Sequence, residues 1–436
     1  MLKRFSGLLA TAAVALPLAA LSLGAPAFAA DTAKVDVKAV VKNYADMAQA
    51  GYEDSLATAK ALKVAIDALV ATPSDATLAA ARKAWIDARV PYMQTEAFRF
   101  GNPIVDKWEG KVNAWPLDEG LIDYTDESYE PSEANPFGKA NVIANTKLKA
   151  GGKTIDATKI TKALLADKLQ EAGKIEANVA TGYHAIEFLL WGQDLNGTDA
   201  GAGKRPATDY STTACTGGHC DRRIQFLKVA TDLLIDDLAE MAKSWAPGGK
   251  ARASIEKDAG KSGGKPALAR ILTGLGSLSY GELAGERMKL GLMLHDPEEE
   301  HDCFSDNTHN AHFYDQQGMV NVYSGHYTRV DGRTVQGPSL SQVVAAVNAD
   351  ADARIKAAMG ETTTAMTAIK STADGGTMAY DQMLGAGNTE GNALIQTAVD
   401  KLVGQKKALE TAVAALGVSI KIEGSKSLDN PSAVKK

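Results

Sequence analysis

The chain has 436 residues, with 47 basic and 53 acidic side chains and a formal net charge of −6 at pH 7. A mildly acidic chain without a basic tract lacks the electrostatic footprint of a nucleic-acid-binding protein. Its length and its 45% hydrophobic content suffice for two domains with buried cores, so disulfides are not needed to hold the fold.

The first 29 residues are predicted to be a cleavable export signal. Lys3 and Arg4 precede an apolar stretch over residues 8–23, and Ala27-Phe28-Ala29 supplies the small-x-small pattern that precedes signal cleavage. No later stretch approaches the ~20 apolar residues that a transmembrane helix needs. We therefore expect a mature chain without a transmembrane segment, in the periplasm or at the cell surface.

Apolar residues recur at spacings of three and four along most of the remaining chain, which indicates helices packed on a core. The spacing predicts helices over residues 37–70, 75–100, 158–173, 177–191, 222–245, 265–294, 339–373 and 392–416. Alternating Val- and Ile-rich runs are nearly absent, so strands should be few and short. The sequence therefore predicts an all-α fold.

Gly, Pro, Asn and Asp collect in three segments that we expect to be long loops: residues 192–218, 247–265 and 296–338. The second, rich in glycine and lysine, is expected to be mobile. The third is rich in aromatic residues and histidines, and is expected to be ordered and functional. A boundary near residue 215 divides the mature chain into an N-terminal domain, 30–215, and a C-terminal domain, 216–436.

The chain has three cysteines. In an oxidising compartment Cys215 and Cys220 are expected to form a disulfide that closes a small loop. The alternative is a metal-binding loop that includes His219. Cys303 is the odd cysteine, either buried or chemically used.

The sharpest local signal is Gly182-Tyr183-His184-Ala185-Ile186-Glu187. His184 and Glu187 are three residues apart, so on a helix they share a face. An imidazole and a carboxylate presented together bind iron, zinc or copper. The alternative is a hydrogen-bonded pair without metal. The apolar run that follows, Phe188-Leu189-Leu190-Trp191, places the pair at the edge of a buried segment, where a charge needs a partner or a metal.

Four blocks of the sequence resemble the imelysin family, and in particular its iron-regulated protein A branch. They are residues 182–192 around the Gly-x-His-x-x-Glu motif, 113–118, 205–210 and 299–309. The resemblance implies two helical domains, each similar to a helix bundle, with a functional cleft between them near the motif. Members of the family are exported, often under iron control, and the family carries the older label of peptidase family M75.

The resemblance also implies further metal ligands. Glu96 is the first candidate, because it ends a block similar to one in iron-uptake relatives in which a glutamate helps to hold metal. Asp118 is the second. The alternatives are a solvated helix carboxylate for Glu96 and a helix N-cap for Asp118. Two carboxylates with His184 and Glu187 would form an oxygen-rich site, which suits iron better than copper(I), with zinc and copper as other candidates.

The remaining candidates are expected to line the cleft. Glu282 and Glu286 are four residues apart on one predicted helix face, and a buried Glu286–Arg287 ion pair is the structural interpretation of this segment. His301-x-Cys303 and His309-x-x-His312 have spacings that suit a second zinc or copper site, whereas the resemblance implies a segment at the mouth of the cleft. The full cleft-lining set is Arg89, Tyr92, Glu286, Arg287, His301, Ser305, Asp306 and His309.

These observations favour an exported metal-binding protein of iron acquisition or homeostasis, whose cargo is a metal ion or a small metal chelate. Envelope iron-transport components are its expected partners. The alternative is a metallopeptidase that uses the same motif. His-Glu-x-x-His is absent, however, and Phe188 follows Glu187, so the inverse motif His-x-x-Glu-His is incomplete. A third class, a structural envelope protein, would use His184 and Glu187 only for packing.

Overall fold

The computed structural model describes residues 35–132, 135–150 and 153–434. The predicted export signal, residues 1–29, lies outside the described residues. Within the described part of the chain, no helix combines the length and the apolar character that crossing a membrane requires.

The all-α prediction is confirmed, since strands are confined to two short antiparallel hairpins, β1–β2 and β3–β4, in the described residues. The α-helices, in chain order, are α1 (Val37–Ala71), α2 (Asp75–Thr95), α3 (Pro103–Glu109), α4 (Glu119–Ile122), α5 (Lys162–Leu164), α6 (Gly182–Trp191), α7 (Cys220–Trp245), α8 (Lys250–Ala259), α9 (Lys265–Ser277), α10 (Leu290–Leu294), α11 (Thr308–Ser324), α12 (Leu340–Val347), α13 (Ala349–Asp374), α14 (Tyr380–Leu384), α15 (Thr389–Leu416) and α16 (Lys426–Asp429). The strands are β1 (Lys147–Ala150), β2 (Lys153–Asp156), β3 (His326–Thr328) and β4 (Thr334–Gln336).

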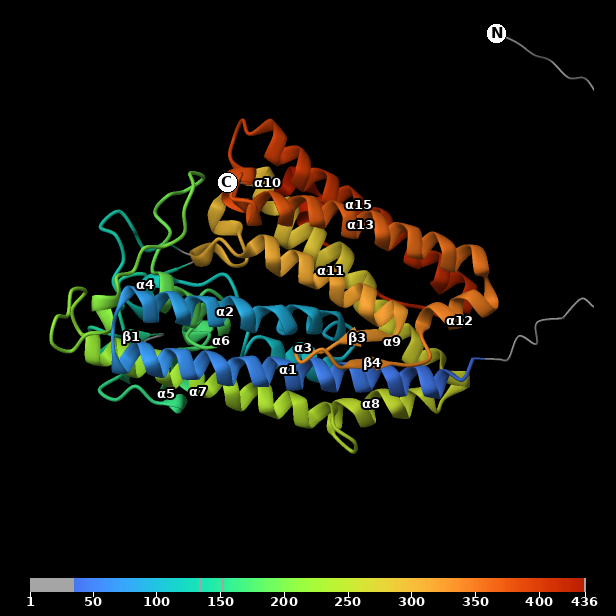
Figure 1. Ribbon diagram of the computed structural model, residues 1–436, viewed down its shortest axis with the longest axis horizontal. Coiled ribbons are helices and arrows are strands. Elements are labelled where there is room, and N and C mark those ends of the chain that lie inside the picture. The colour runs from blue at the N-terminus through green and yellow to red at the C-terminus, as the bar shows by residue number, and fades with distance from the viewer. Residues whose placement is uncertain (1–34, 133–134, 151–152, 435–436) are drawn as a thin grey trace, which may run out of the picture. The chain divides into compact units, whose positions relative to one another are not determined.

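The first layer of helices is built on α1, which packs against α2, α7 and α8 (Figure 1). Asp36 caps α1 by accepting a hydrogen bond from the Lys38 N–H. Ser74 and Thr77 form a capping box at the start of α2, which satisfies backbone donors that no helical carbonyl can reach. Short α6 is enclosed between α2 and α7, with which it is in contact.

The second layer contains α13 and α15, which pack against one another and, through α15, against α9 and the π-helical segment η6 (Leu278–Lys289). Helix α11 joins the layers, because it contacts α2 on one side and α13 on the other (Figure 1). Gly318 permits this approach: a Cβ atom there would lie 2.4 Å from the Gln94 carbonyl oxygen. Helices α7 and α8 follow residue 215 in the chain, yet they pack with α1. The domain boundary near residue 215 stays a prediction.

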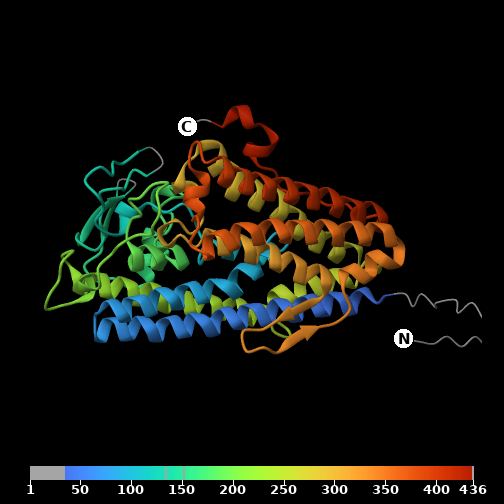
Figure 2. The same ribbon diagram turned by 45° about the horizontal axis from the view of Figure 1, so that its top comes forward.

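The β3–β4 hairpin lies along α1 (Figure 2) and is tied to it by one buried carboxylate. Asp54 accepts hydrogen bonds from the Tyr327 hydroxyl at 2.9 Å and from the Arg329 guanidinium at 2.8 Å. Tyr327 pairs with Val335 in the hairpin register. The hairpin thus fixes the exit of α11 against the first layer.

Two of the expected loops contain helices. Residues 296–338 hold α11, whose buried face is largely polar and includes His312, Asp315, Gln316 and Asn321. A polar buried face gives no hydrophobic periodicity, so the pattern that predicts helices fails there. Residues 247–265 hold α8, which buries Ala251, Ile255 and Ala259 at a spacing of four.

Several of the expected helices differ from those in the structure. Within residues 158–173, α5 is continued only by the π-helical stretch Leu165–Leu169, and Gly173, in the following 3-10 turn, lies in the left-handed region with φ at 71°. The expected helix over residues 265–294 is π-helical over Leu278–Lys289, in η6. In a π-helix the hydrogen bonds run between residues five apart, so residues five apart lie much closer to one face than they do in an α-helix.

Candidate metal centre

The Gly-x-His-x-x-Glu motif begins α6, and every residue of that helix is buried. Gly182 has φ at 80°, and a Cβ atom there would lie 2.4 Å from the Val112 carbonyl oxygen. The same carbonyl accepts a hydrogen bond from the Tyr183 N–H at 2.7 Å. Only glycine combines this backbone conformation with this close approach, so Gly182 sets where the helix starts and which way His184 and Glu187 face.

The last three carbonyl groups of α6, Leu189–Trp191, would be buried without partners, and two side chains and one backbone N–H from elsewhere satisfy them. The Tyr210 hydroxyl donates to Leu189, Arg82 Nε donates to Leu190 at 3.0 Å, and the Arg205 N–H donates to Trp191 at 2.7 Å. The block 205–210 therefore acts as the C-terminal clamp of the motif helix.

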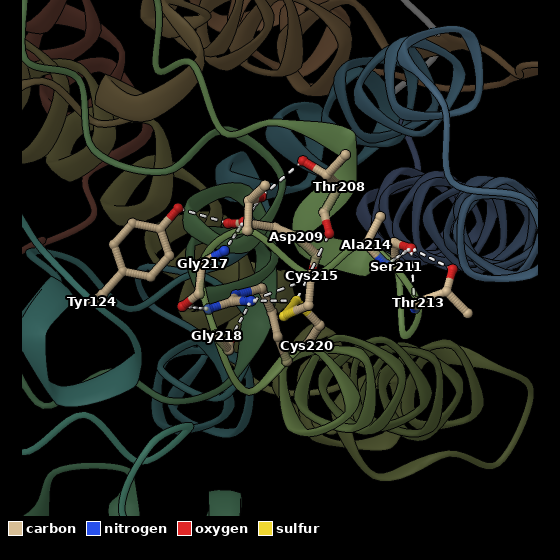
Figure 3. The surroundings of a disulfide bond; sticks show 12 residues. Tyr124, Thr208, Asp209, Ser211, Thr213, Ala214, Cys215, Gly217, Gly218 and Cys220 are labelled. Atoms are coloured by element: carbon tan, nitrogen blue, oxygen red, sulfur yellow. Dashed lines mark hydrogen bonds between the residues drawn. A yellow bond between two sulfur atoms is a disulfide. The ribbon is translucent and has the colours of Figure 1, made fainter.

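A disulfide supports this clamp from the outside. Cys215 and Cys220 are bonded, with Cα atoms 5.9 Å apart, which is the alternative that the sequence analysis favours over a metal loop. Inside the loop, the Gly217 N–H donates to Asp209 at 2.7 Å (Figure 3). Asp209 also accepts from Arg205 at 3.0 Å. The loop thus fixes the carboxylate that holds Arg205.

His184 and Glu187 form a buried pair. His184 Nδ1 lies 3.0 Å from Glu187 Oε2, and the two side chains are 1% and 0% exposed. The other oxygen of Glu187 accepts hydrogen bonds from the Ser305 N–H at 3.0 Å and from the Ser305 hydroxyl at 2.6 Å. Ser305, a predicted cleft residue, is therefore a direct partner of the motif although 118 residues separate it from Glu187.

His301 and Asp302 complete the cluster. The structure places one ligand atom each of His184, His301 and Asp302 within 4.8 Å of one another, and all three residues are buried. His184 Nδ1 is 3.9 Å from Asp302 Oδ1, and the two imidazole rings are 4.7 Å apart at their centroids. We call these three residues the histidine group.

Arg89, another predicted cleft residue, holds Asp302 in place. Its guanidinium donates to both carboxylate oxygens, at 2.7 and 3.2 Å, and to Asn113 at 2.6 Å, and lies 3.2 Å from His301 Nδ1. Asn307 adds a hydrogen bond to Asp302 at 2.8 Å. A bidentate arginine fixes the carboxylate in one orientation and offsets its charge.

Burial controls the protonation of the cluster. It lowers the pKa of His184 well below its usual value, and the charges of Arg89 and Arg287 lower it further. The pKa of His301 is lowered by burial and by Arg287 and His184. Burial raises the pKa of Glu187 well above its usual value, and Asp302 adds to the rise. Both imidazoles are therefore neutral at neutral pH, which is the form that binds metal ions.

The residues fit a transition-metal ion. His184 Nε2 is buried and has no hydrogen-bond partner among the described residues, which leaves an unsatisfied donor or acceptor. Two imidazoles with one or two carboxylates are donors that iron and zinc accept. Arg89 neutralises part of the carboxylate charge, yet each oxygen of Asp302 can still offer a second lone pair.

Glu96 and Asp118 lie outside the histidine group. Glu96 is buried rather than solvated, and accepts from the Tyr92 hydroxyl at 3.1 Å and from Arg287 at 2.8 Å. Asp118 precedes α4 without a side-chain capping bond, accepts from Tyr129 at 3.0 Å, and has a second oxygen without a partner in the described structure. Their roles as ligands stay predictions.

The expected Glu286–Arg287 ion pair is wrong. Glu286 is exposed, whereas buried Arg287 pairs with Glu282 at 2.7 Å, Glu96 at 2.8 Å and Asp315 at 3.0 Å. The reason is the π-helical geometry of η6, which brings residues 282 and 287 onto one face. Arg287 thus links η6 to α11 and to the end of α2.

The other two histidines of the 301–312 segment, His309 and His312, are not part of the histidine group. His309 pairs with Asp374 at 3.0 Å, and His312 is buried against the Tyr380 ring, with centroids 5.1 Å apart. Asp306 adopts a left-handed conformation, with φ at 55°, and lies near Asp194 and Asp381 instead. Among the described residues, the candidate metal groups do not combine His301 with Cys303, His309 or His312.

Asp302 is the member of the group that sequence reasoning does not single out. It stands in the block 299–309 between residues that were named, but nothing local distinguishes it from its acidic neighbours. Its partner Arg89 lies 213 residues away, so the pairing becomes visible only when α2 and this segment meet.

Comparison with known proteins agrees with this fold. A family model described as imelysin, the M75 peptidase family, matches residues 48–409. A crystal structure provisionally described as an iron-regulated protein A precursor from Parabacteroides distasonis ATCC 8503 is similar, with a TM-score of 0.62 and 20% identity, over 87% of this chain and 95% of that chain. No curated protein matches. Because the family model spans most of its length, the chain belongs to the imelysin family.

Proposed function

We propose that the chain binds a transition-metal ion, iron foremost, at His184, His301 and Asp302 with Glu187, and that it serves iron acquisition or homeostasis. One observation carries the proposal: two buried imidazoles and a buried carboxylate, from segments more than a hundred residues apart, have ligand atoms within 4.8 Å of each other.

The donor set supports an iron or zinc ion rather than copper(I), because it offers nitrogen and oxygen without a thiolate or thioether. Glu187 and Asp302 carry two negative charges when ionised, and Arg89 carries one positive charge. A divalent cation would therefore favour ionised Glu187, whose pKa burial otherwise raises. The burial of the donors favours a bare ion over a bulky chelate as cargo.

The proposal includes export to the periplasm or the cell surface. The Cys215–Cys220 disulfide supports an oxidising compartment, and the apolar N-terminal segment that ends in Ala27-Phe28-Ala29 supports a cleaved signal. Family membership and the name of the similar crystal structure support a role in iron handling. Envelope components of iron transport would be the partners.

We do not extend the proposal to peptide hydrolysis. A metallopeptidase needs a carboxylate that is free to accept a proton from water. Both oxygens of Glu187 have partners, one in His184 and the other in Ser305. The described geometry therefore favours Glu187 as a ligand or as an orienting group for His184.

The test is metal analysis of the purified, chelator-treated protein after separate exposure to iron, zinc and copper salts. We expect about one iron per chain in the wild type, lost in His184→Ala and His301→Ala. His219→Ala is the matched control, because His219 is exposed. Circular dichroism establishes that each variant is folded.

A wild type that retains no metal under any condition would overturn the proposal, as would folded His184→Ala and His301→Ala variants that bind iron normally. Casein cleavage by the wild type and His219→Ala, lost in His184→Ala, would favour the metallopeptidase alternative instead.

A further inference from the structure

Three carboxylates from distant parts of the chain meet beside the histidine group. Asp194 follows α6, Asp306 lies between the turn Cys303–Ser305 and α11, and Asp381 lies in α14. One oxygen of each lies within 4.8 Å of an oxygen of the other two. We call these three residues the acidic group.

The most buried member has no partner. Asp381 is 2% exposed, and neither of its oxygens makes a hydrogen bond within the described structure. One oxygen of Asp306 is likewise buried without a partner. Asp194 accepts from the Asn196 backbone and side chain, at 2.9 and 2.6 Å, through a single oxygen. The acidic group thus combines three nearby carboxylates with oxygens that lack hydrogen-bond partners within the described structure.

Glu300 is a second, independent sign of a ligand. It is 1% exposed, and both of its oxygens are buried without a hydrogen-bond partner among described residues. Glu300 and Asp194 also line one small cavity, together with Glu119, Glu298 and Cys303.

No described cation balances this charge. Lys204 is the positive side chain that lowers the pKa of Asp194, but its ammonium group donates to the Asn196 amide oxygen at 3.3 Å. Burial, followed by the charges of Asp381 and Asp194, raises the pKa of Asp306 to about 7. Burial raises that of Asp381 to about 6. Unpaired buried charges are costly, so at neutral pH these carboxylates need protons or a cation.

We propose that Asp194, Asp306 and Asp381, with Glu300 nearby, bind a hard divalent cation of the calcium type. The chemistry favours calcium because the free donors of the group are carboxylate oxygens carried on loops and a short helix. Ca²⁺ accepts six to eight oxygen ligands in flexible geometry. Asp194 and Asp306 are only half-buried, so water can reach the cation and supply the remaining ligands.

The consequence concerns the neighbouring histidine group. Asp306 directly follows Ser305, whose N–H and hydroxyl each donate a hydrogen bond to Glu187. His301 and Asp302 belong to the same short segment. A cation that holds Asp306 therefore fixes the segment that supplies two donors and one orienting residue to the transition-metal site.

The experiment uses the purified protein after treatment with chelator, with thermal unfolding and calorimetric titration of CaCl₂ as readouts. We expect saturable binding of about one Ca²⁺ per chain and a rise in Tm. Asp381→Asn and Asp306→Asn should lower the affinity at least tenfold, whereas Asp87→Asn, a change in an exposed carboxylate paired with Lys83, should not. His184→Ala should bind Ca²⁺ normally, which separates this site from the proposed iron site.

A second readout distinguishes loss of a site from damage to the fold. Without calcium, Asp381→Asn should melt at a higher temperature than the wild type at pH 8, because it removes an unpaired charge. With calcium the order should reverse. A wild type whose Tm does not respond to millimolar CaCl₂, or a folded Asp381→Asn protein that binds Ca²⁺ as the wild type does, would overturn the proposal.

Discussion

The histidine group and the acidic group both take residues from one segment, 301–306, but their buried carboxylates are balanced in different ways. In the histidine group, Asp302 is held by two hydrogen bonds from Arg89 and one from Asn307. In the acidic group, Asp381 has no hydrogen-bond partner among the described residues. The counter-ion of Asp302 is Arg89, within the protein, whereas the acidic group depends on cations or protons from the solution.

This difference has a physical meaning. A buried carboxylate that is paired with arginine keeps its charge and its orientation over a wide range of conditions. A buried carboxylate without a partner changes its protonation or binds a cation, so its state follows pH and ion concentration. We therefore expect the histidine group to be the rigid part of the site and the acidic group to be the responsive part.

The strongest test of the rigid part is Arg89→Ala. It would leave Asp302 buried without its counter-ion, so we expect a loss of about 3–5 kcal/mol in the free energy of unfolding. Urea unfolding at pH 7 measures this loss. Arg333→Ala is the control, because the Arg333–Asp331 pair is exposed to solvent, and it should leave the midpoint unchanged. If the two variants unfold at the same urea concentration, the Arg89–Asp302 pair does not hold the segment.

The next effect is on pH dependence, where the two groups have opposite signs. The unfolded Asp381 loses its proton near pH 3.8 and the folded one near 6. Between these values the folded state binds more protons, so metal-free stability falls as pH rises. The pKa of His301 is lowered on folding, so the unfolded state binds more protons below pH 6.5, and stability falls as pH falls.

Two variants test separately the opposite pH dependences that Asp381 and His301 give to stability. In chelator, the stability of Asp381→Asn relative to the wild type should increase by about 2 kcal/mol between pH 4 and pH 7, after allowance for solvent screening. The stability of His301→Asn relative to the wild type should instead increase as pH falls below 6.5. Urea unfolding at four or five pH values gives both curves. Parallel curves for the two variants would remove the distinction between the groups.

The fold was predictable from sequence where the buried face of a helix is apolar. The predicted helix over residues 37–70 corresponds to α1 (Val37–Ala71), and residues 222–245 correspond to α7 (Cys220–Trp245). Helix α11 was not predicted, because His312 and Asp315 lie on its buried face. The polar residues of the candidate site lie on such buried faces, so hydrophobic periodicity does not predict the helices that carry them.

The site was predictable only as far as local spacing reaches. His184 and Glu187 are three residues apart on a helix, and their contact follows from that spacing. The approach of Asp302 to His184, and of Asp381 to Asp194, depends on how segments that are distant in the sequence pack. Neither a repeat nor a spacing encodes such contacts; the sequence pointed to the 299–309 segment, through its histidines and its resemblance to the family, but not to Asp302 as the residue that approaches His184.

The smallest expected effect is that of Ser305→Ala, which tests the link between the two groups. The variant loses the hydroxyl hydrogen bond to Glu187 and keeps the backbone one, so we expect about 1.5 kcal/mol of destabilisation and roughly tenfold weaker iron binding. Ser371→Ala, on the exposed face of α13, is the matched control. Calcium affinity should be unchanged, because Asp306 keeps its backbone position. If calcium binding weakens as much as iron binding, the segment moves as one unit and the two groups form a single coupled site.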